Sequence, residues 1–168
     1  MEDAQKEAFK YQLDILKNEI NSTNDVINQI NTITQSIKNW AITVWTGSIA
    51  LILIKSQYDL KKFVIFTCVI PLLFWVVDGM WRRHQSRMIY RITLISKFLN
   101  SEDFKESFQK SKLINFKLLD MRARNSEHEK EYKKATDIRR ILMFNTIKYF
   151  YGGLAFVSII LGVYFIIN

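Results

Sequence analysis

Three apolar runs alternate with polar segments along this chain of 168 residues. The first two, residues 39–54 and 63–77, contain no charged side chain and are separated by the short polar segment KSQYDLKK. Each run is slightly shorter than the ~20 residues that an α-helix needs to cross ~30 Å of hydrocarbon. Trp40 and Trp81 mark the ends of the two runs, because tryptophan is typical of the membrane–water interface. The pattern therefore predicts a transmembrane hairpin over residues 39–81.

The third apolar run predicts another transmembrane helix within residues 141–168. Residues 149–167 are uncharged and carry aromatic side chains at both ends. A hairpin buried in a soluble protein is the alternative for the first two runs, but a domain of this size could hardly bury all three. The predicted fold class is accordingly an all-α membrane protein.

The polar segment at the start, residues 1–38, has helical periodicity and contains neither Pro nor Gly. Apolar and Thr side chains recur at spacings of three and four over four heptads, which is the pattern of a coiled coil. The predicted self-association residues are Leu13, Leu16, Ile20, Ile27, Ile30 and Ile37. Packing of this stripe within its own subunit is an alternative, and binding to the membrane surface is another. A helix break near Asn21, with Ser22 as the N-cap of the following helix, is also compatible with the pattern.

Residues 82–140 are expected to form a basic, mainly helical cytoplasmic segment. An apolar stripe extends the second membrane helix to about Leu99, and a short helix bearing Phe104 and Phe108 is expected to begin near Ser101. Residues 112–119 fit either a strand or an amphipathic turn. Residues 121–137 fit a solvated loop or helix.

The net charge of +8 indicates the topology. Residues 82–140 carry sixteen Lys or Arg and eight Asp or Glu, so this segment holds the whole excess of positive charge. Because basic residues concentrate on the cytoplasmic side of membrane proteins, the N-terminus and this segment are predicted to be cytoplasmic. The short hairpin loop and the C-terminus would then lie outside. A bacterial inner membrane is the expected location.

A few residues within the membrane runs depart from plain hydrocarbon and are candidates for pore or gating roles. Thr43 and Gly47 lie one helical turn apart and would let another helix approach closely. Pro71 is expected to kink the second helix. Asp78 precedes Arg82 by four residues, so it forms either a local ion pair at the interface or part of an ion path.

The sequence shows little catalytic chemistry, and an enzyme is not predicted. No nucleophile–base–acid set is visible, and the two His residues lack further ligands at metal-binding spacing. A single Cys excludes an intrachain disulfide. Neither a metal nor another cofactor is expected.

Basic residues near the membrane runs are the candidates for binding an anionic ligand. They are Lys38, Arg82, Arg83, Arg87, Arg91, Arg139 and Arg140. Topology and attraction to anionic lipid headgroups account for such residues. Because the basic excess continues beyond them to residue 124, a polyanion such as a nucleic acid or nucleotide is a second hypothesis.

Three short motifs resemble those of a known family. They are K-x-W-x-x-T at the start of the first run, I-P-x-x-F-W-x-x-D in the second and F-Y-G in the third. The residues that carry them are Lys38, Trp40 and Thr43; Ile70, Pro71, Phe74, Trp75 and Asp78; and Phe150, Tyr151 and Gly152. On these residues the chain resembles small bacterial three-span membrane effectors of antiphage defence operons, the Hailong membrane effectors. The likeness covers roughly residues 30–95 and 141–165.

The resemblance implies a homo-oligomer, specifically a tetramer, that forms an ion-conducting path. It also implies a partner nucleotidyltransferase and a single-stranded DNA ligand that holds the channel shut. The expected function is thus an ion channel or membrane-disrupting effector gated by an anionic cytoplasmic ligand. The alternative is a membrane-anchored coiled-coil scaffold that recruits a cytoplasmic partner protein.

Overall fold

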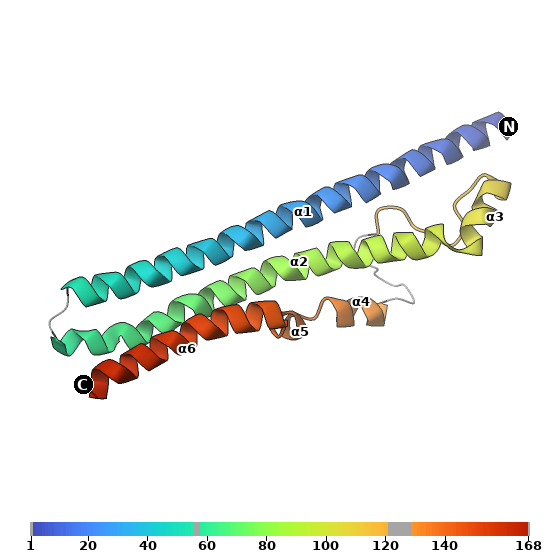
Figure 1. Cartoon of the computed structure of the whole chain (residues 1–168). Coiled ribbons are helices and arrows are strands. Elements are labelled where there is room, and N and C mark those ends of the chain that lie inside the picture. Colours follow the sequence, from blue (N-terminus) through green and yellow to red (C-terminus); the bar gives the residue numbers. More distant parts are fainter. Residues whose placement is uncertain (1, 56–57, 121–128, 168) are drawn as a thin grey trace. The chain divides into compact units, whose positions relative to one another are not determined.

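A computed structural model describes residues 2–55, 58–120 and 129–167 (Figure 1). Helices joined by irregular segments make up this described part, which contains no strand. In chain order the helices are α1 (Glu2–Lys55), the 3-10 helix η1 (Tyr58–Cys68), α2 (Val69–Leu99), α3 (Glu102–Lys110), α4 (Glu129–Ala135), α5 (Ile138–Leu142) and α6 (Asn145–Ile167). Three of the helical stretches are long and apolar enough to cross a membrane. The predicted all-helical fold with three candidate spans is confirmed.

The chain divides into two compact units, each made of two stretches of sequence. The first, here called the polar unit, comprises Met1–Gln29 and His84–Thr136. The second, here called the span unit, comprises Ile30–Arg83 and Asp137–Asn168. Helices α1 and α2 each belong to both units, because the division falls within them.

Helix α1 is one continuous helix of 54 residues, so the predicted N-terminal helix runs directly into the first apolar run. The helix break considered near Asn21 does not occur. The hydroxyl of Ser22 donates to the carbonyl of Glu19 at 3.2 Å, which is a bond within the helix and not an N-cap. With no Pro or Gly nearby, and with Leu16 and Thr23 buried on either side, tertiary packing overrides the weak helix propensity of Asn.

The second apolar run begins as 3-10 helix and becomes α-helix only at Val69. Pro71, at which a kink is predicted, is the third residue of α2 and lies in its first turn, directly after the 3-10 helix. Proline is tolerated there since the first N–H groups of a helix have no intrahelical acceptor. Its ring also prevents an α-helix from continuing back through Thr67. The 3-10 geometry rises ~2.0 Å per residue, so this short run covers ~25 Å.

A hydrophobic cluster forms the core of the polar unit. Leu16, Ile95 and Phe98 are buried at its centre. The rings of Phe98 and Phe116 stack with their centroids 4.2 Å apart, and Phe104 meets Phe98 edge-on. The predicted α3 is present, with Ser101 as its N-cap residue. Residues 112–119 form no strand; they are irregular chain that contributes side chains to this core.

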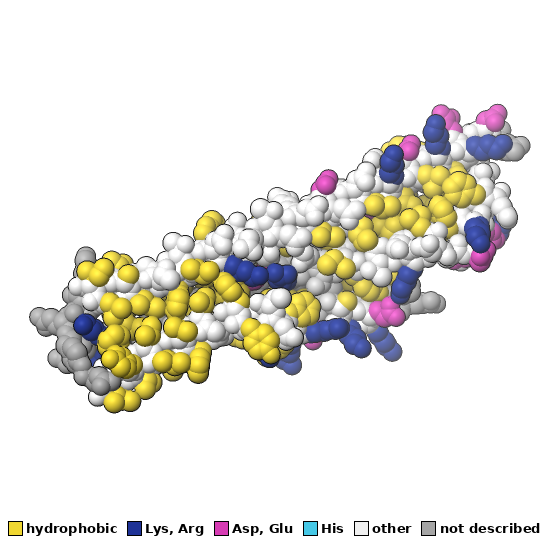
Figure 2. Space-filling view, in the orientation of Figure 1, with side chains coloured by type: hydrophobic (Ala, Val, Ile, Leu, Met, Phe, Trp, Pro, Cys, Tyr) yellow, Lys and Arg dark blue, Asp and Glu magenta, His cyan; other side chains and the backbone are white. Residues whose placement is uncertain are grey.

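Close packing of all three apolar runs forms the core of the span unit. Ala41, Ile141, Ile147 and Tyr151 are fully buried there, with Phe74, Trp75 and Phe150 packed around them. Large apolar side chains cover the outside of the same helices, as Figure 2 shows over α1 and α6. An exposed apolar surface of this kind is typical of a protein that lies in a membrane.

Candidate functional site: two buried ion pairs

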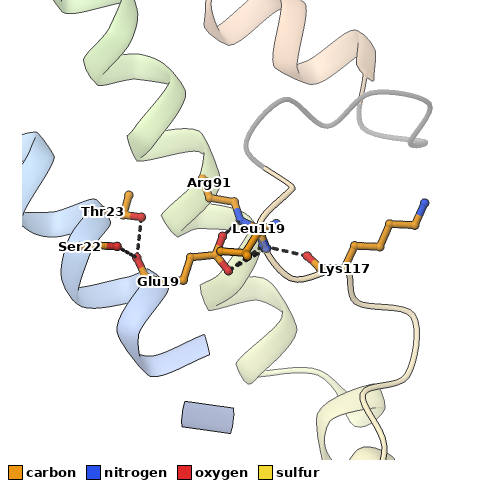
Figure 3. A network of polar contacts seen from close by, with 6 residues as sticks. All are labelled: Glu19, Ser22, Thr23, Arg91, Lys117 and Leu119. Atoms are coloured by element: carbon orange, nitrogen blue, oxygen red, sulfur yellow. Dashed lines mark hydrogen bonds and ion pairs between the residues drawn. The ribbon is translucent and has the colours of Figure 1, made fainter. Parts of the chain in front are cut away.

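A buried ion pair joins α1 and α2 in the polar unit (Figure 3). Glu19 is 2% exposed and Arg91 is 4% exposed. Arg91 Nε donates to Glu19 Oε1 at 2.6 Å, and Arg91 Nη2 donates to Oε2 at 3.1 Å. This two-point geometry is the strong form of an arginine–carboxylate contact.

Irregular residues 112–119 complete the same network. Arg91 Nη2 also donates to the carbonyl of Lys117 at 2.8 Å, and the N–H of Leu119 donates to Glu19 Oε2 at 3.2 Å. Leu119 has a φ of 58°, a left-handed conformation that is uncommon for a residue with a branched side chain. The guanidinium of Arg91 also lies 5.0 Å from the ring centroid of Phe116. The pair therefore fixes three segments at one point.

Arg91 was predicted to belong to the anion-binding set, and the structure corrects this prediction. Its guanidinium is buried and already held by a carboxylate, so it is not part of an open basic surface. Glu19 was missed by the sequence interpretation. The sequence does contain a feature that indicates its burial. Glu19 lies three residues after Leu16 and four before Thr23, so it is an acid on the apolar face of the helix.

A second buried acid, Asp78, lies in the span unit. Asp78 and Tyr151 are both 0% exposed, and the hydroxyl of Tyr151 donates to Asp78 Oδ2 at 3.2 Å. The predicted ion pair is present, with Arg82 Nε 3.4 Å from Asp78 Oδ1. These two atoms lack hydrogen-bond geometry, and within the described residues neither has another hydrogen-bond partner. The acid is thus held by the tyrosine and only loosely by the arginine.

Helix α5 packs directly on α2 next to this acid. A Cβ atom on Gly79 would lie 2.4 Å from Leu142 Cδ2, so the absence of a side chain permits the close approach. Trp75 Nε1 donates to the carbonyl of Leu142 at 3.0 Å. The end of α5 is therefore attached to α2 at two successive turns.

A polar contact also links the three apolar runs to one another. Ser158 on α6 is fully buried and accepts hydrogen bonds from Trp45 Nε1 at 2.7 Å and from Thr67 Oγ1 at 3.0 Å. One turn further on, a Cβ atom on Gly162 would lie 2.8 Å from the Cα atom of Ile65. The small residues of α6 thus allow η1 to approach its backbone.

Thr43 and Gly47, the small pair of the first apolar run, are both exposed in the described part of the chain. A Cβ atom on Gly47 would meet nothing within 4 Å. Thr43 is exposed, and its hydroxyl donates to the carbonyl of Asn39 at 2.9 Å. Among the described residues no element makes the predicted close approach at Gly47, and the approach of a neighbouring helix there stays a prediction.

The predicted anion-binding residues are divided between the two units. Lys38, Arg82, Arg83, Arg139 and Arg140 belong to the span unit, whereas Arg87 and Arg91 belong to the polar unit. Within the span unit the two arginines of α5 are exposed. Lys38 is half-buried, with its Nζ 5.8 Å from the ring centroid of Phe150.

Packing within the single chain buries some of the predicted self-association residues. Leu16, Ile30 and Ile37 are buried, and Leu13, Ile20 and Ile27 are half-buried. The buried three fit the intramolecular alternative. An open apolar groove of about 240 Å³ remains in the polar unit. It is lined by Leu13, Leu16, Lys17, Ile20, Asn21, Leu99, Phe104 and Phe108.

No group of three His, Cys, Asp or Glu side chains that could hold a metal ion occurs in the described ranges 2–55, 58–120 and 129–167. Comparisons with family models, curated proteins and solved structures find no match. The class of the protein is therefore defined by its own fold: it is all-helical, with three candidate membrane-spanning helices that point to a multi-pass membrane protein.

Proposed function

We propose that this chain is a homo-oligomeric effector of the bacterial inner membrane, an ion channel or membrane-disrupting protein of antiphage defence controlled by an anionic cytoplasmic ligand. The proposal is supported by the motifs that resemble the Hailong membrane effectors. One structural observation carries it furthest. The helices that hold Glu19 and Arg91 in the polar unit are the same helices that continue into the apolar runs of the span unit.

The ligand would act by competing with Glu19 for Arg91. A phosphate group binds a guanidinium with the same two-point geometry as a carboxylate. Breaking a buried ion pair costs about 3–5 kcal/mol, so the ligand must supply that energy through further contacts. Arg87 and Lys117 are basic residues of the same unit. Release of Glu19 would remove the polar contact between α1 and α2 in this unit, and a change in either helix would reach its apolar run directly.

Self-association would use surfaces that the single chain leaves open. In the apolar part, Thr43 and Gly47 offer a small-residue face on α1 to a second copy. In the polar unit, the groove beside Leu13 and Ile20 offers an apolar one. A tetramer is the state that the resemblance implies, with the N-terminus cytoplasmic and the C-terminus outside.

Ion flux from proteoliposomes that contain the purified full chain tests this function. Flux is measured with and without single-stranded DNA oligonucleotides, and at two salt concentrations because binding of a polyanion weakens with salt. We expect the oligonucleotide to change the flux. Glu19→Gln, which holds Arg91 less strongly, should lower the concentration that is required, whereas the exposed Glu7→Gln should not. Flux that no oligonucleotide changes in any variant would reject the proposal.

The apolar groove of the polar unit favours a second candidate function, a membrane-anchored scaffold. A helix with apolar side chains at successive turns would fit a groove of this kind, and the implied nucleotidyltransferase is a partner to test. Binding of that enzyme to the full chain, lost in Leu13→Asp and retained in Tyr11→Asp, would support the scaffold. Such binding, together with no ligand-dependent ion flux from the proteoliposomes, would favour the scaffold over the channel.

A further inference from the structure

The connection between α5 and α6 combines exposed cations with exposed apolar side chains. Arg139 and Arg140 on α5 are exposed. The two residues that follow α5, Met143 and Phe144, are 63% and 39% exposed. Lys148 places its Nζ 5.0 Å from the ring centroid of Tyr149, which is itself 68% exposed. We call residues 139–149 the elbow.

Its inner side fixes the elbow to the rest of the span unit. Ile141 is fully buried in the core cluster. The carbonyl of Leu142 accepts from Trp75, and its side chain fills the space beside Gly79. The N–H of Phe144 donates to the carbonyl of Ile141 at 3.1 Å, and this turn joins α5 to α6. The cations and apolar side chains are therefore displayed from a fixed position.

The elbow lies at the depth of lipid headgroups if α6 crosses the bilayer. Residues 149–167 are uncharged and span ~28 Å as an α-helix, which matches the ~30 Å hydrocarbon layer. Phe144 precedes Tyr149 by five residues, a distance of ~7 Å that falls within the headgroup region. Apolar side chains with cations beside them suit this region, because the apolar side chains can turn towards the edge of the acyl region while the cations meet phosphate.

We infer that the elbow binds the headgroups of anionic phospholipids through Arg139, Arg140 and Lys148, with Met143 and Phe144 lying among the headgroups and facing the edge of the acyl region. A nucleic acid would meet the same cations but would leave Met143 without a partner, which favours the lipid. This inference is independent of the proposed channel function, since it requires neither a pore nor a soluble ligand.

Tryptophan fluorescence of the full chain in vesicles provides the test. Brominated phosphatidylglycerol or brominated phosphatidylcholine is mixed with unlabelled phosphatidylcholine, and quenching gives the relative affinity for each lipid. Trp75 is a reporter, because it is bonded to the elbow. We expect the chain to prefer the anionic lipid, by about fivefold for each cation that contacts it. Arg139→Gln/Arg140→Gln should lower the preference by about 25-fold, to the roughly fivefold that Lys148 alone supports.

A matched control removes two cations elsewhere. Lys105→Gln/Lys110→Gln loses the same charge from α3 in the polar unit and should keep the preference. Met143→Ser/Phe144→Ser should weaken quenching by both lipids alike, with assembly size measured to check folding. Equal quenching in the unchanged chain, or an unaltered preference in Arg139→Gln/Arg140→Gln, would overturn the inference. So would displacement of the anionic lipid by a single-stranded oligonucleotide at low concentration, since the site would then be one for polyanions.

Discussion

The ion pairs made by the buried acids Glu19 and Asp78 differ in how completely their polar atoms are satisfied. In the polar unit, Glu19 and Arg91 share two hydrogen bonds, and each makes another with the backbone of residues 117–119. In the span unit, Asp78 Oδ1 and Arg82 Nε lie 3.4 Å apart without hydrogen-bond geometry. A fully satisfied polar network specifies a unique structure, whereas a partly satisfied one costs free energy.

The difference indicates what holds each unit together. In the polar unit the ion pair adds a polar contact to an apolar core that already joins α1, α2 and the irregular segment. The span unit instead depends on the close approach of small residues, such as Gly162 against Ile65. Its ion pair contributes little to that packing. We therefore expect substitutions at Glu19 to act mainly on stability, and substitutions at Asp78 to act mainly on conformational change.

The largest effect is expected from Glu19→Ala. This change leaves the buried guanidinium of Arg91 without its partner and removes the acceptor for the N–H of Leu119, so the polar unit should lose about 3–5 kcal/mol. Hydrogen exchange of the full chain in detergent micelles measures the loss at the amides of residues 112–119.

Two further variants show whether the pair itself is responsible. The exposed Glu7→Ala should leave the exchange unchanged. Glu19→Leu/Arg91→Leu should lose less than Glu19→Ala, because an apolar pair leaves no buried charge. Equal exchange in Glu19→Ala and Glu7→Ala would show that the ion pair does not stabilise this unit.

The next largest effect is expected from Gly162→Ala in the span unit. The added Cβ would lie 2.8 Å from the Cα atom of Ile65, and a backbone atom cannot move aside cheaply. Overpacking of this kind costs about 1–3 kcal/mol. Thermal unfolding in micelles, followed by circular dichroism, should show the loss. Gly153→Ala is the matched control, since a Cβ there meets nothing within 4 Å; a lower Tm in both variants alike would remove packing as the cause.

Sequence patterns predicted the elements of this fold better than its contacts. Uncharged runs such as residues 149–167 have few structural solutions, and Ser101 followed by two acids marks the start of α3. A heptad pattern, by contrast, is the same whether its partner is another chain or another helix of the same chain. That is why Leu16 was assigned to self-association although it is buried within the single chain.

The candidate site was predictable only where it is local in sequence. Asp78 and Arg82 lie four residues apart on one helix, and the spacing alone predicts their contact. Glu19 and Arg91 are 72 residues apart, and only the tertiary structure brings them together. The position of Pro71 within its helix was also not predictable from the local sequence. It follows from the residue at which the 3-10 helix η1 ends and α2 begins.

A smaller effect is expected from Tyr151→Phe. The change removes the hydroxyl that donates to Asp78 Oδ2, so a buried carboxylate loses its one geometrically sound hydrogen bond among the described contacts. The free energy of unfolding should fall by about 1–3 kcal/mol, with the smaller loss if Arg82 moves closer to Asp78. Thermal unfolding in micelles measures it. A Tyr151→Phe variant as stable as the unchanged chain would mean that Arg82 compensates fully.

The smallest effect on stability, but the largest on function, is expected from Asp78→Asn. An amide oxygen can still accept from Tyr151, so the packing of the buried side chain is kept, and only the loose contact with Arg82 is lost. We expect the Tm and the assembly size to change little, while ion flux from proteoliposomes changes clearly in size or in ligand dependence. The double variant Asp78→Asn/Arg82→Gln separates the two groups: if it behaves as Asp78→Asn alone, the contact between them controls the change. If Asp78→Asn instead abolishes the assembly, the acid is a structural residue, and the two ion pairs have the same role.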